Sequence, residues 1–178
     1  MSIERKWEDI DIEFLAATAK EKTLKFGYHV PTVIAVGSLG TVLGQISGEA
    51  DSSEERARAM RVLGRAFQKA GKLGDLHRLY FISEGWMSEV EGPEKRINIK
   101  PSQDPNRKEI LLISELNLIK RQTNLILFEM ERNENGELVA IDTYKNIKGD
   151  LEAKAYLLEE FVQGFNQERN GGNGNIRK

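Results

Sequence analysis

Leu79-Tyr80-Phe81-Ile82, an apolar run that ends at Ser83-Glu84-Gly85-Trp86-Met87, is the stretch that decides the fold of this chain. Short apolar runs bounded by Gly and polar residues are typical of buried strands. A polar stretch follows, and then Pro101-Ser102-Gln103-Asp104-Pro105-Asn106-Arg107-Lys108-Glu109 leads into a second apolar run. The pattern predicts strands over 79–83 and 109–116, joined by a long loop over 89–106.

Outward from these two strands, the sequence indicates four more. Residues 124–131 and 137–144 flank Asn135-Gly136, a pair that supplies the positive φ required by a tight hairpin. On the N-terminal side, the apolar runs 30–36 and 41–46 are separated by Gly37-Ser38-Leu39-Gly40. We therefore expect two hairpins and a largely antiparallel sheet.

Three segments have the apolar spacing of amphipathic helices. The first covers about 10–26 and ends at Gly27, the second covers 52–70 after the capping sequence Asp51-Ser52-Ser53, and the third covers 151–165. The apolar positions expected to face the core are Ile10, Phe14, Ala17 and Leu24; Met60, Leu63, Phe67 and Ala70; and Leu151, Ala155, Leu158, Val162 and Phe165. We expect the second and third helices to bury these stripes on the sheet.

Adjacent strands outnumber strand–helix alternations, which favours an α+β fold over a doubly wound one. We expect one domain over residues 1–169, with an antiparallel sheet of about five or six strands packed with helices. Residues 170–178 begin Asn170-Gly171-Gly172-Asn173-Gly174-Asn175 and are expected to form a disordered polar tail.

Composition limits the classes of function. The chain has 178 residues, 39% hydrophobic and 30% charged, with a net charge of −2, which gives no general attraction to nucleic acid. Cys is absent, which excludes disulfides, a thiol nucleophile and thiolate-bound metals. The N-terminus has no apolar segment of the signal-peptide type, and the window 30–46 is broken by Pro31 and glycines, so we expect a cytoplasmic protein without a membrane span.

No complete catalytic motif accompanies this composition. Gly37-x-x-Gly40 leads into a strand without a Lys and is better explained by a hairpin than by a phosphate loop. His29 and His77 have neither a nucleophile elbow nor a zinc-binding spacing, and both are expected to be turn or surface residues.

The candidate site residues surround the long loop. They are Glu84, Trp86, Asp104, Arg107 and Glu109. Converging carboxylates could hold Mg²⁺ or act as an acid and base, whereas Trp86 could contact a ligand or cap the core. The structural alternative, which we favour, is that Glu84 or Asp104 forms a buried or half-buried ion pair with Arg107 and fastens the loop.

The same residues carry a resemblance. Ser83-Glu84-Gly85-Trp86-Met87 followed by Pro101-Ser102-x-Asp104-Pro105-x-Arg107-x-Glu109 resembles a pattern in uncharacterised bacterial proteins, in which Ala stands at the position of Gly85. The resemblance covers about residues 79–110 and implies no activity. It favours the same five candidate residues.

The sequence thus favours a non-catalytic binding or interaction module without a cofactor or a bound metal. A homo-oligomer formed through exposed strand edges or the apolar 30–46 region is the expected partnership, with neither a membrane nor general nucleic-acid binding. The competing hypothesis is a small metal-dependent hydrolase or phosphate-ester enzyme, in which Glu84, Asp104 and Glu109 hold a cation and Arg107 neutralises an anionic substrate.

Overall fold

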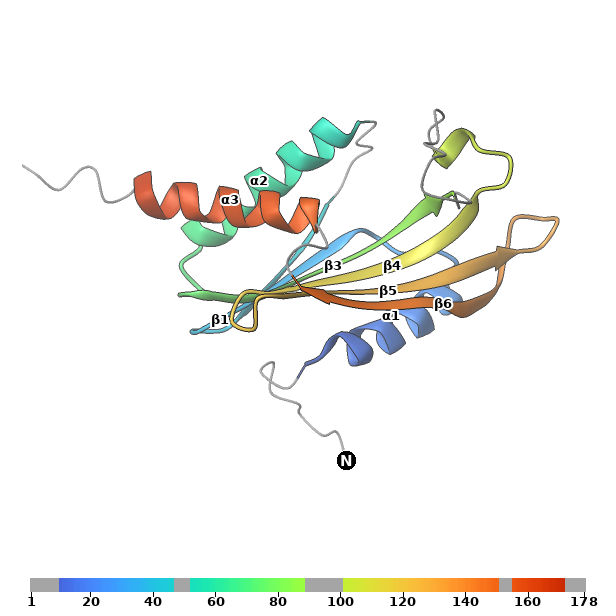
Figure 1. Ribbon diagram of the computed structural model, residues 1–178, viewed down its shortest axis with the longest axis horizontal. Helices are drawn as coiled ribbons and strands as arrows, with labels where there is room; N and C mark the ends of the chain where they lie inside the picture. The colour runs from blue at the N-terminus through green and yellow to red at the C-terminus, as the bar shows by residue number, and fades with distance from the viewer. Residues whose placement is uncertain (1–9, 47–51, 89–100, 151–154, 172–178) are drawn as a thin grey trace, which may run out of the picture.

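The computed structural model describes residues 10–46, 52–88, 101–150 and 155–171 (Figure 1). Within them lie the helices α1 (Ile12–Phe26), α2 (Ser53–Lys69) and α3 (Tyr156–Gly171), and the short 3-10 helix η2 (Pro101–Gln103). The strands are β1 (Thr32–Gly37), β2 (Thr41–Gln45), β3 (Leu76–Met87), β4 (Lys108–Asn117), β5 (Gln122–Arg132) and β6 (Leu138–Asp150).

The strands form one antiparallel sheet of six strands in the order β2-β1-β3-β4-β5-β6. Helix α1 lies on one face, and α2 with α3 lies on the other (Figure 1). The predicted α+β fold with an antiparallel sheet and three helices is therefore confirmed. None of the helices in the described part of the chain has the length and apolar character needed to cross a membrane.

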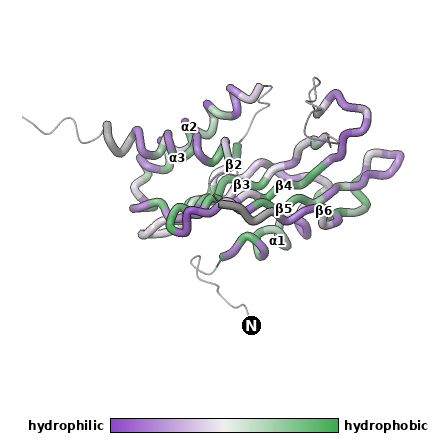
Figure 2. Tube along the Cα trace, in the orientation of Figure 1, coloured by the Kyte–Doolittle hydropathy of each residue, from purple (hydrophilic) through white to green (hydrophobic). Residues whose placement is uncertain are grey.

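The period-two alternation of strand side chains gives the sheet two buried faces. On β3, Tyr80 and Ile82 pack on the α1 side, whereas Leu79 and Phe81 pack under α2 and α3. Apolar residues accordingly follow one another along the central strands (Figure 2). A strand that is buried on both faces has a continuous apolar run in its sequence, which explains why residues 79–82 predict a strand so clearly.

Several boundaries differ from the predicted ones. Strand β3 does not stop at Ser83 but continues to Met87, so Glu84 and Trp86 are strand residues. The third helix runs to Gly171, two positions into the expected tail. Residues 89–100 of the expected loop, 151–154 of the expected helix and 172–178 of the expected tail lie outside the described residues.

The first helix buries a different stripe from the predicted one. Its buried residues are Ile12, Leu15, Ala16, Ala19 and Thr23, at helical spacing. Phe14 and Leu24, expected in the core, are 38% and 39% exposed. Apolar residues occur on both sides of this short helix, so hydrophobic spacing alone does not fix which side faces the sheet. The helix ends as predicted, because Gly27 adopts φ +80° and donates its N–H to the carbonyl of Thr23.

Helices α2 and α3 cross at a point where both carry glycine. A Cβ added to Gly64 would lie 2.2 Å from the carbonyl oxygen of Phe161, and one added to Gly164 would lie 2.1 Å from that of Arg61. The rings of Phe67 and Phe161 meet edge to face beside this crossing, 5.3 Å apart. The two backbones thus touch directly, and this contact sets the distance between the helices.

Strand β6 is irregular at its pairing with β5. Leu127 pairs with Lys145 and Phe128 with Thr143, which leaves Tyr144 as an extra residue on β6. A second shift pairs Glu131 with Ala140 and Arg132 with Leu138. These are β-bulges, which bend and twist the strand that carries them.

The glycine crossing yields a stability prediction. Gly164→Ala should lower the free energy of unfolding by about 1–3 kcal/mol, because a methyl group there clashes with backbone that cannot relax as a side chain can. Chemical denaturation measures the change. Gly85→Ala is the matched control, since its added Cβ meets nothing within 4 Å and should change stability by less than about 0.5 kcal/mol. Equal effects of the two variants would contradict the proposed close contact.

Candidate ligand-binding site

The five residues singled out from the sequence all lie at one end of the sheet. Glu84 and Trp86 are on β3, and Glu109 is on β4 directly opposite Trp86. Asp104 and Arg107 precede β4. The structure therefore brings these residues to one region, but it pairs them differently from the predicted clasp.

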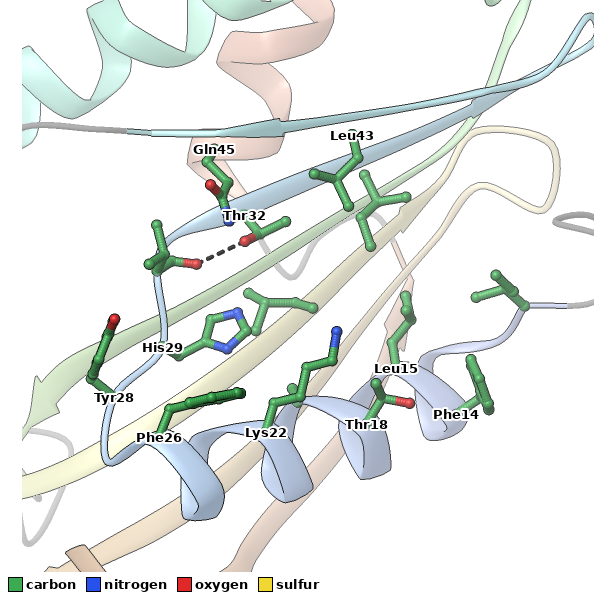
Figure 3. Close-up of a pocket in the computed structure, with 15 residues that line it drawn as sticks. Phe14, Leu15, Thr18, Lys22, Phe26, Tyr28, His29, Thr32, Leu43 and Gln45 are labelled. Carbon is green, nitrogen blue, oxygen red and sulfur yellow. Dashed lines mark hydrogen bonds between the residues drawn. The ribbon is translucent and has the colours of Figure 1, made fainter.

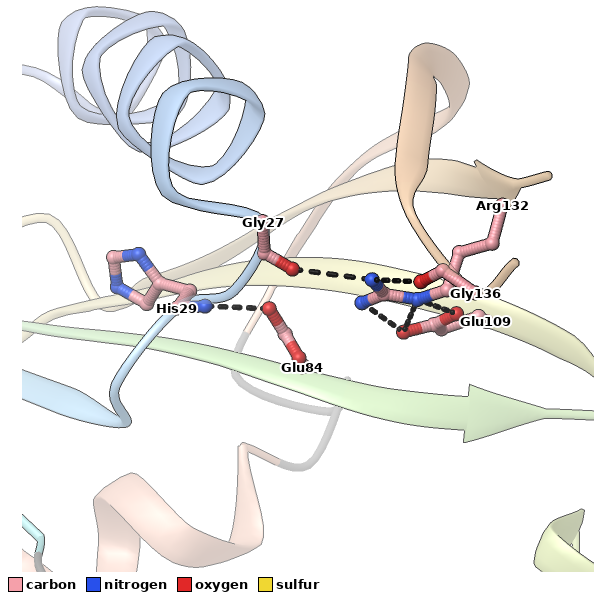
Figure 4. A network of polar contacts seen from close by, with 6 residues as sticks. All are labelled: Gly27, His29, Glu84, Glu109, Arg132 and Gly136. Carbon is pink, nitrogen blue, oxygen red and sulfur yellow. Dashed lines mark hydrogen bonds and ion pairs between the residues drawn. The ribbon is translucent and has the colours of Figure 1, made fainter.

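Glu109 has Arg132 of β5 as its partner. The guanidinium donates from Nε and Nη2 to both carboxylate oxygens at 2.8–3.1 Å (Figure 4). Its Nη1 also donates to the carbonyls of Gly27 and Gly136, each at 3.2 Å. Arg132 thus ties the end of α1 and the β5–β6 hairpin to the centre of the sheet. A bidentate pair with these added bonds is among the stronger polar contacts in proteins.

Glu84 is half-buried beside this ion pair. Its Oε1 accepts a hydrogen bond from the backbone N–H of His29, just after α1 (Figure 4). Burial raises the pKa of the Glu84 carboxyl, an effect that the His29 N–H and nearby Arg132 oppose and Glu109 reinforces. The carboxylate therefore holds the α1–β1 connection in place.

The predicted ion pair of Arg107 is wrong. Its guanidinium stacks on Trp86, with Cζ 4.4 Å from the ring centroid, and donates to the carbonyl of Ser102 at 2.8 Å. Asp104 accepts the N–H of Asn106 at 2.8 Å, as in an Asx turn, and Glu84 turns instead toward His29. Both the sequence order and the charge suggested Arg107, but strand pairing places Arg132 next to the acids.

The carboxylates do not converge on a cation site. Among the described residues, no group of three or more His, Cys, Asp or Glu is placed to hold a metal ion. Glu109 is already bound to Arg132, and Asp104 belongs to a separate turn. This geometry gives no support to the metal-dependent hydrolase hypothesis. A binding role for Glu84, Trp86, Asp104, Arg107 and Glu109 stays a prediction.

A cavity lies on the face of the sheet that α1 covers, between α1 and strands β1 and β2 (Figure 3). Its volume is about 460 Å³, within the range of sites for small molecules. The floor is apolar and is formed by Leu15, Ala19, Ile34 and Ile82, among others. The cavity exists because the buried stripe of α1 covers only part of this face and leaves the β1–β2 side open.

The rim of the cavity is formed by exposed apolar side chains. Phe26, Tyr28 and Leu43 line it and are 60%, 62% and 54% exposed. Phe14, the residue that hydrophobic spacing assigned to the core, lies at the same rim (Figure 3). Clustered exposed apolar residues mark interaction sites more often than scattered ones do. We call Phe14, Phe26, Tyr28 and Leu43 the apolar rim.

Few polar groups enter this cavity. Lys22 extends from α1 toward the strands and carries the one formal charge among the described lining residues (Figure 3). Burial, and then the charge of Lys22, lower the pKa of His29 below its ordinary value of 6.5, so its imidazole is neutral near neutral pH. The cavity is therefore an apolar space with one cation at its mouth.

Sequence reasoning missed this site and treated His29 as a turn or surface residue. Three of its residues lie at the α1–β1 connection, where Phe26-Gly27-Tyr28-His29 places two aromatic residues around a helix-terminating glycine. Two aromatic residues on either side of a glycine expected to end a helix are the signal that could have drawn attention to it.

No protein-family model, curated protein or solved structure matches the chain.

The Arg132 contacts predict a large effect on stability. Arg132→Gln should lower the free energy of unfolding by about 2 kcal/mol or more, because Glu109 and two carbonyls lose a half-buried charged donor. Arg107→Gln removes the same charge from an exposed position and should cost less than about 1 kcal/mol. Denaturant unfolding of both variants measures the difference, and a reversed order would contradict this assignment.

Glu84 gives a prediction with a defined pH dependence. Since its folded-state pKa is raised, the ionised form is a stability cost that appears as pH rises above about 4.5, the ordinary value. Glu84→Gln keeps an acceptor for the His29 N–H without the charge, so it should stabilise the fold near neutral pH. This advantage should shrink as pH falls toward the ordinary value. Unfolding titrations at several pH values test this, and a pH-independent difference would refute it.

Proposed function

We propose that this chain is a non-catalytic binding module, and that it takes a small organic anion with an apolar body into the cavity between α1 and β1–β2. The observation that carries the proposal is the cavity of about 460 Å³ with an apolar floor, an exposed apolar rim and Lys22 at its mouth. Sites for small ligands are mostly apolar with a few polar groups that fix orientation.

The anion is argued from charge. Lys22 is exposed, and no carboxylate is among the described residues that line the cavity. Its ammonium group can therefore pair with a ligand carboxylate while the body of the ligand displaces water from Ile34, Ile82 and their neighbours. Removal of apolar surface from water contributes roughly 25 cal/mol per Å², so the body supplies most of the affinity. The charge contributes a smaller part, because the site is open to solvent.

A second copy of the chain is the other occupant that the apolar rim would fit. Homo-oligomerisation was expected from the sequence through strand edges or the 30–46 region, and Leu43 of the rim belongs to that region. We favour the small ligand because the cavity continues inward to Leu15 and Ala19, beyond the depth that a flat self-contact would fill.

Binding can be tested with anilinonaphthalene sulfonate, an apolar fluorescent anion, and with decanoate as its competitor. We expect saturable fluorescence with the folded protein and displacement by decanoate. Thr18→Trp, which fills the cavity from α1, should weaken binding by at least about tenfold, and Lys22→Gln by about threefold.

Val62→Trp and Lys145→Gln are the matched controls for these variants. Both change exposed positions that do not line the cavity, and they should leave binding unchanged. Near-UV circular dichroism of each variant excludes dye binding to a loosened core. Sedimentation velocity separates the two occupants. A dimer that Thr18→Trp converts to a monomer would show that the rim is an interface between copies and would overturn the ligand proposal.

A further inference from the structure

We infer that the protein docks on the surface of an anionic lipid bilayer through the face of the sheet that α1 covers, the α1 face. The apolar rim and Trp86 enter the headgroup layer, and nearby cations meet the lipid phosphates. This inference goes beyond the proposed function and does not depend on it, because it concerns the exposed surface around the cavity. The sequence predicts no membrane partner because it has no spanning segment, but a contact at the bilayer surface does not need one.

Exposed aromatic side chains are concentrated on the α1 face. Phe26 and Tyr28 of the apolar rim are both more than half exposed. Trp86 is 44% exposed, and the alternation of side chains along β3 places it on the same face as Tyr80, which packs on the α1 side. Tyr156 on α3 is the one large aromatic residue exposed elsewhere among the described residues. Tyr and Trp are enriched at membrane interfaces, where an apolar ring meets polar headgroups.

A chain of direct contacts links Trp86 to the end of α1. Strand pairing sets Trp86 opposite Glu109, and Glu109 binds Arg132. Arg132 in turn donates to the carbonyl of Gly27, the residue between the two rim aromatics Phe26 and Tyr28 (Figure 4). Trp86 and the rim therefore belong to one continuous surface.

Three exposed cations accompany these aromatic residues. Lys22 lines the cavity mouth, Nζ of Lys25 lies 5.4 Å from the ring centroid of Phe26, and the guanidinium of Arg107 stacks on Trp86. None of the three is in an ion pair with another residue that the structure describes. A cation on an aromatic ring keeps its charge available to an anion on its other side.

The charge along α1 is positive on the side of the cavity. At about 100° per residue, Lys22 and Lys25 continue the stripe that begins with Phe14 at the rim. Glu21 is the one acidic residue of the helix next to this stripe, because Glu13 points to the other side of α1. Two lysines against one glutamate, with Arg107 beyond the helix end, favour an anionic partner.

The residue types favour a lipid surface over a second protein surface. Aromatic residues and Arg are enriched in both kinds of contact, but Lys is depleted in protein–protein interfaces. Near an anionic bilayer, each Lys instead gains electrostatic energy. A twofold contact between two copies, centred on the rim, would also bring Lys22 and Lys25 of one copy toward those of the other. Lipid phosphates neutralise these charges, whereas a second copy adds to them.

The test uses the full chain and vesicles of phosphatidylcholine, either pure or with about a quarter of phosphatidylglycerol. We expect the protein to sediment with the mixed vesicles, and to do so less with pure phosphatidylcholine or in high salt. Phe26→Ser combined with Tyr28→Ser should weaken binding to mixed vesicles at least about tenfold, because two rings no longer leave water. Lys22→Gln combined with Lys25→Gln should weaken it about tenfold, with little effect on pure phosphatidylcholine.

Matched controls come from outside the α1 face. Val62→Ser with Tyr156→Ser removes two apolar side chains that are about half exposed, and Arg58→Gln with Lys145→Gln removes two exposed cations. Both double variants should bind vesicles like the parent protein. Thr18→Trp should do so as well, since it fills the cavity and leaves the rim in place. Loss of vesicle binding in Thr18→Trp would show uptake of lipid by the cavity and would overturn the surface contact.

Fluorescence of Trp86 identifies the surface that touches the bilayer. Trp86 is the only tryptophan in a Trp7→Phe variant, and lipids with brominated acyl chains should quench it on binding. Vesicle binding without this quenching would overturn the inference. So would a dimer, measured by sedimentation velocity, that Phe26→Ser with Tyr28→Ser converts to a monomer, because the surface then belongs to a second copy. Saturable dye binding without vesicle binding would overturn this inference and leave the proposed function standing.

Discussion

The contact between Arg132 and the carbonyl of Gly27 anchors the C-terminal end of α1 to the sheet. The helix packs on the sheet through its buried stripe of Ile12, Leu15, Ala16, Ala19 and Thr23. Its end is also held by a guanidinium that is itself anchored by both oxygens of Glu109. Because Glu109 sits on the central strand β4, the helix end is tied to the most constrained part of the fold.

The position of α1 in turn creates the cavity. Six strands present more surface than one helix of 15 residues can cover, and α1 contacts the β4–β6 side. On the opposite face α2 and α3 pack as a pair and cover the β1–β3 side. The two helical layers thus cover different strands, and the α1 face is left open over β1 and β2. The apolar floor and the exposed rim are two consequences of this unequal coverage.

The sequence predicted the elements that depend on interactions between neighbouring residues, and it did not predict those that depend on distant contacts. The β5–β6 hairpin and the second helix were predictable because Asn135-Gly136 and the N-cap Ser52 act within a few residues. Ser83-Glu84-Gly85-Trp86 was predicted to end the strand, because no neighbouring residue indicates that Glu84 accepts a hydrogen bond from the N–H of His29, 55 positions away in the sequence. The partner of Glu109 likewise depends on the register that pairs it with Met130, two residues before Arg132. A cavity is formed by residues that are distant in the sequence. For this cavity, the sequence shows only the aromatic residues on either side of Gly27 as a local indication.

The irregular pairing of β6 affects whether a strand of another chain can add to the edge of this sheet. An outermost strand offers unpaired N–H and C=O groups to any extended chain, and a long regular one invites fibril-like addition. The extra residues on β6 interrupt that row of donors and acceptors and twist it away from the straight course an incoming strand would need. At the other border β2 has only five residues and includes Gly44. Both borders therefore make poor templates, which allows the protein to expose apolar side chains on its face without also offering its backbone.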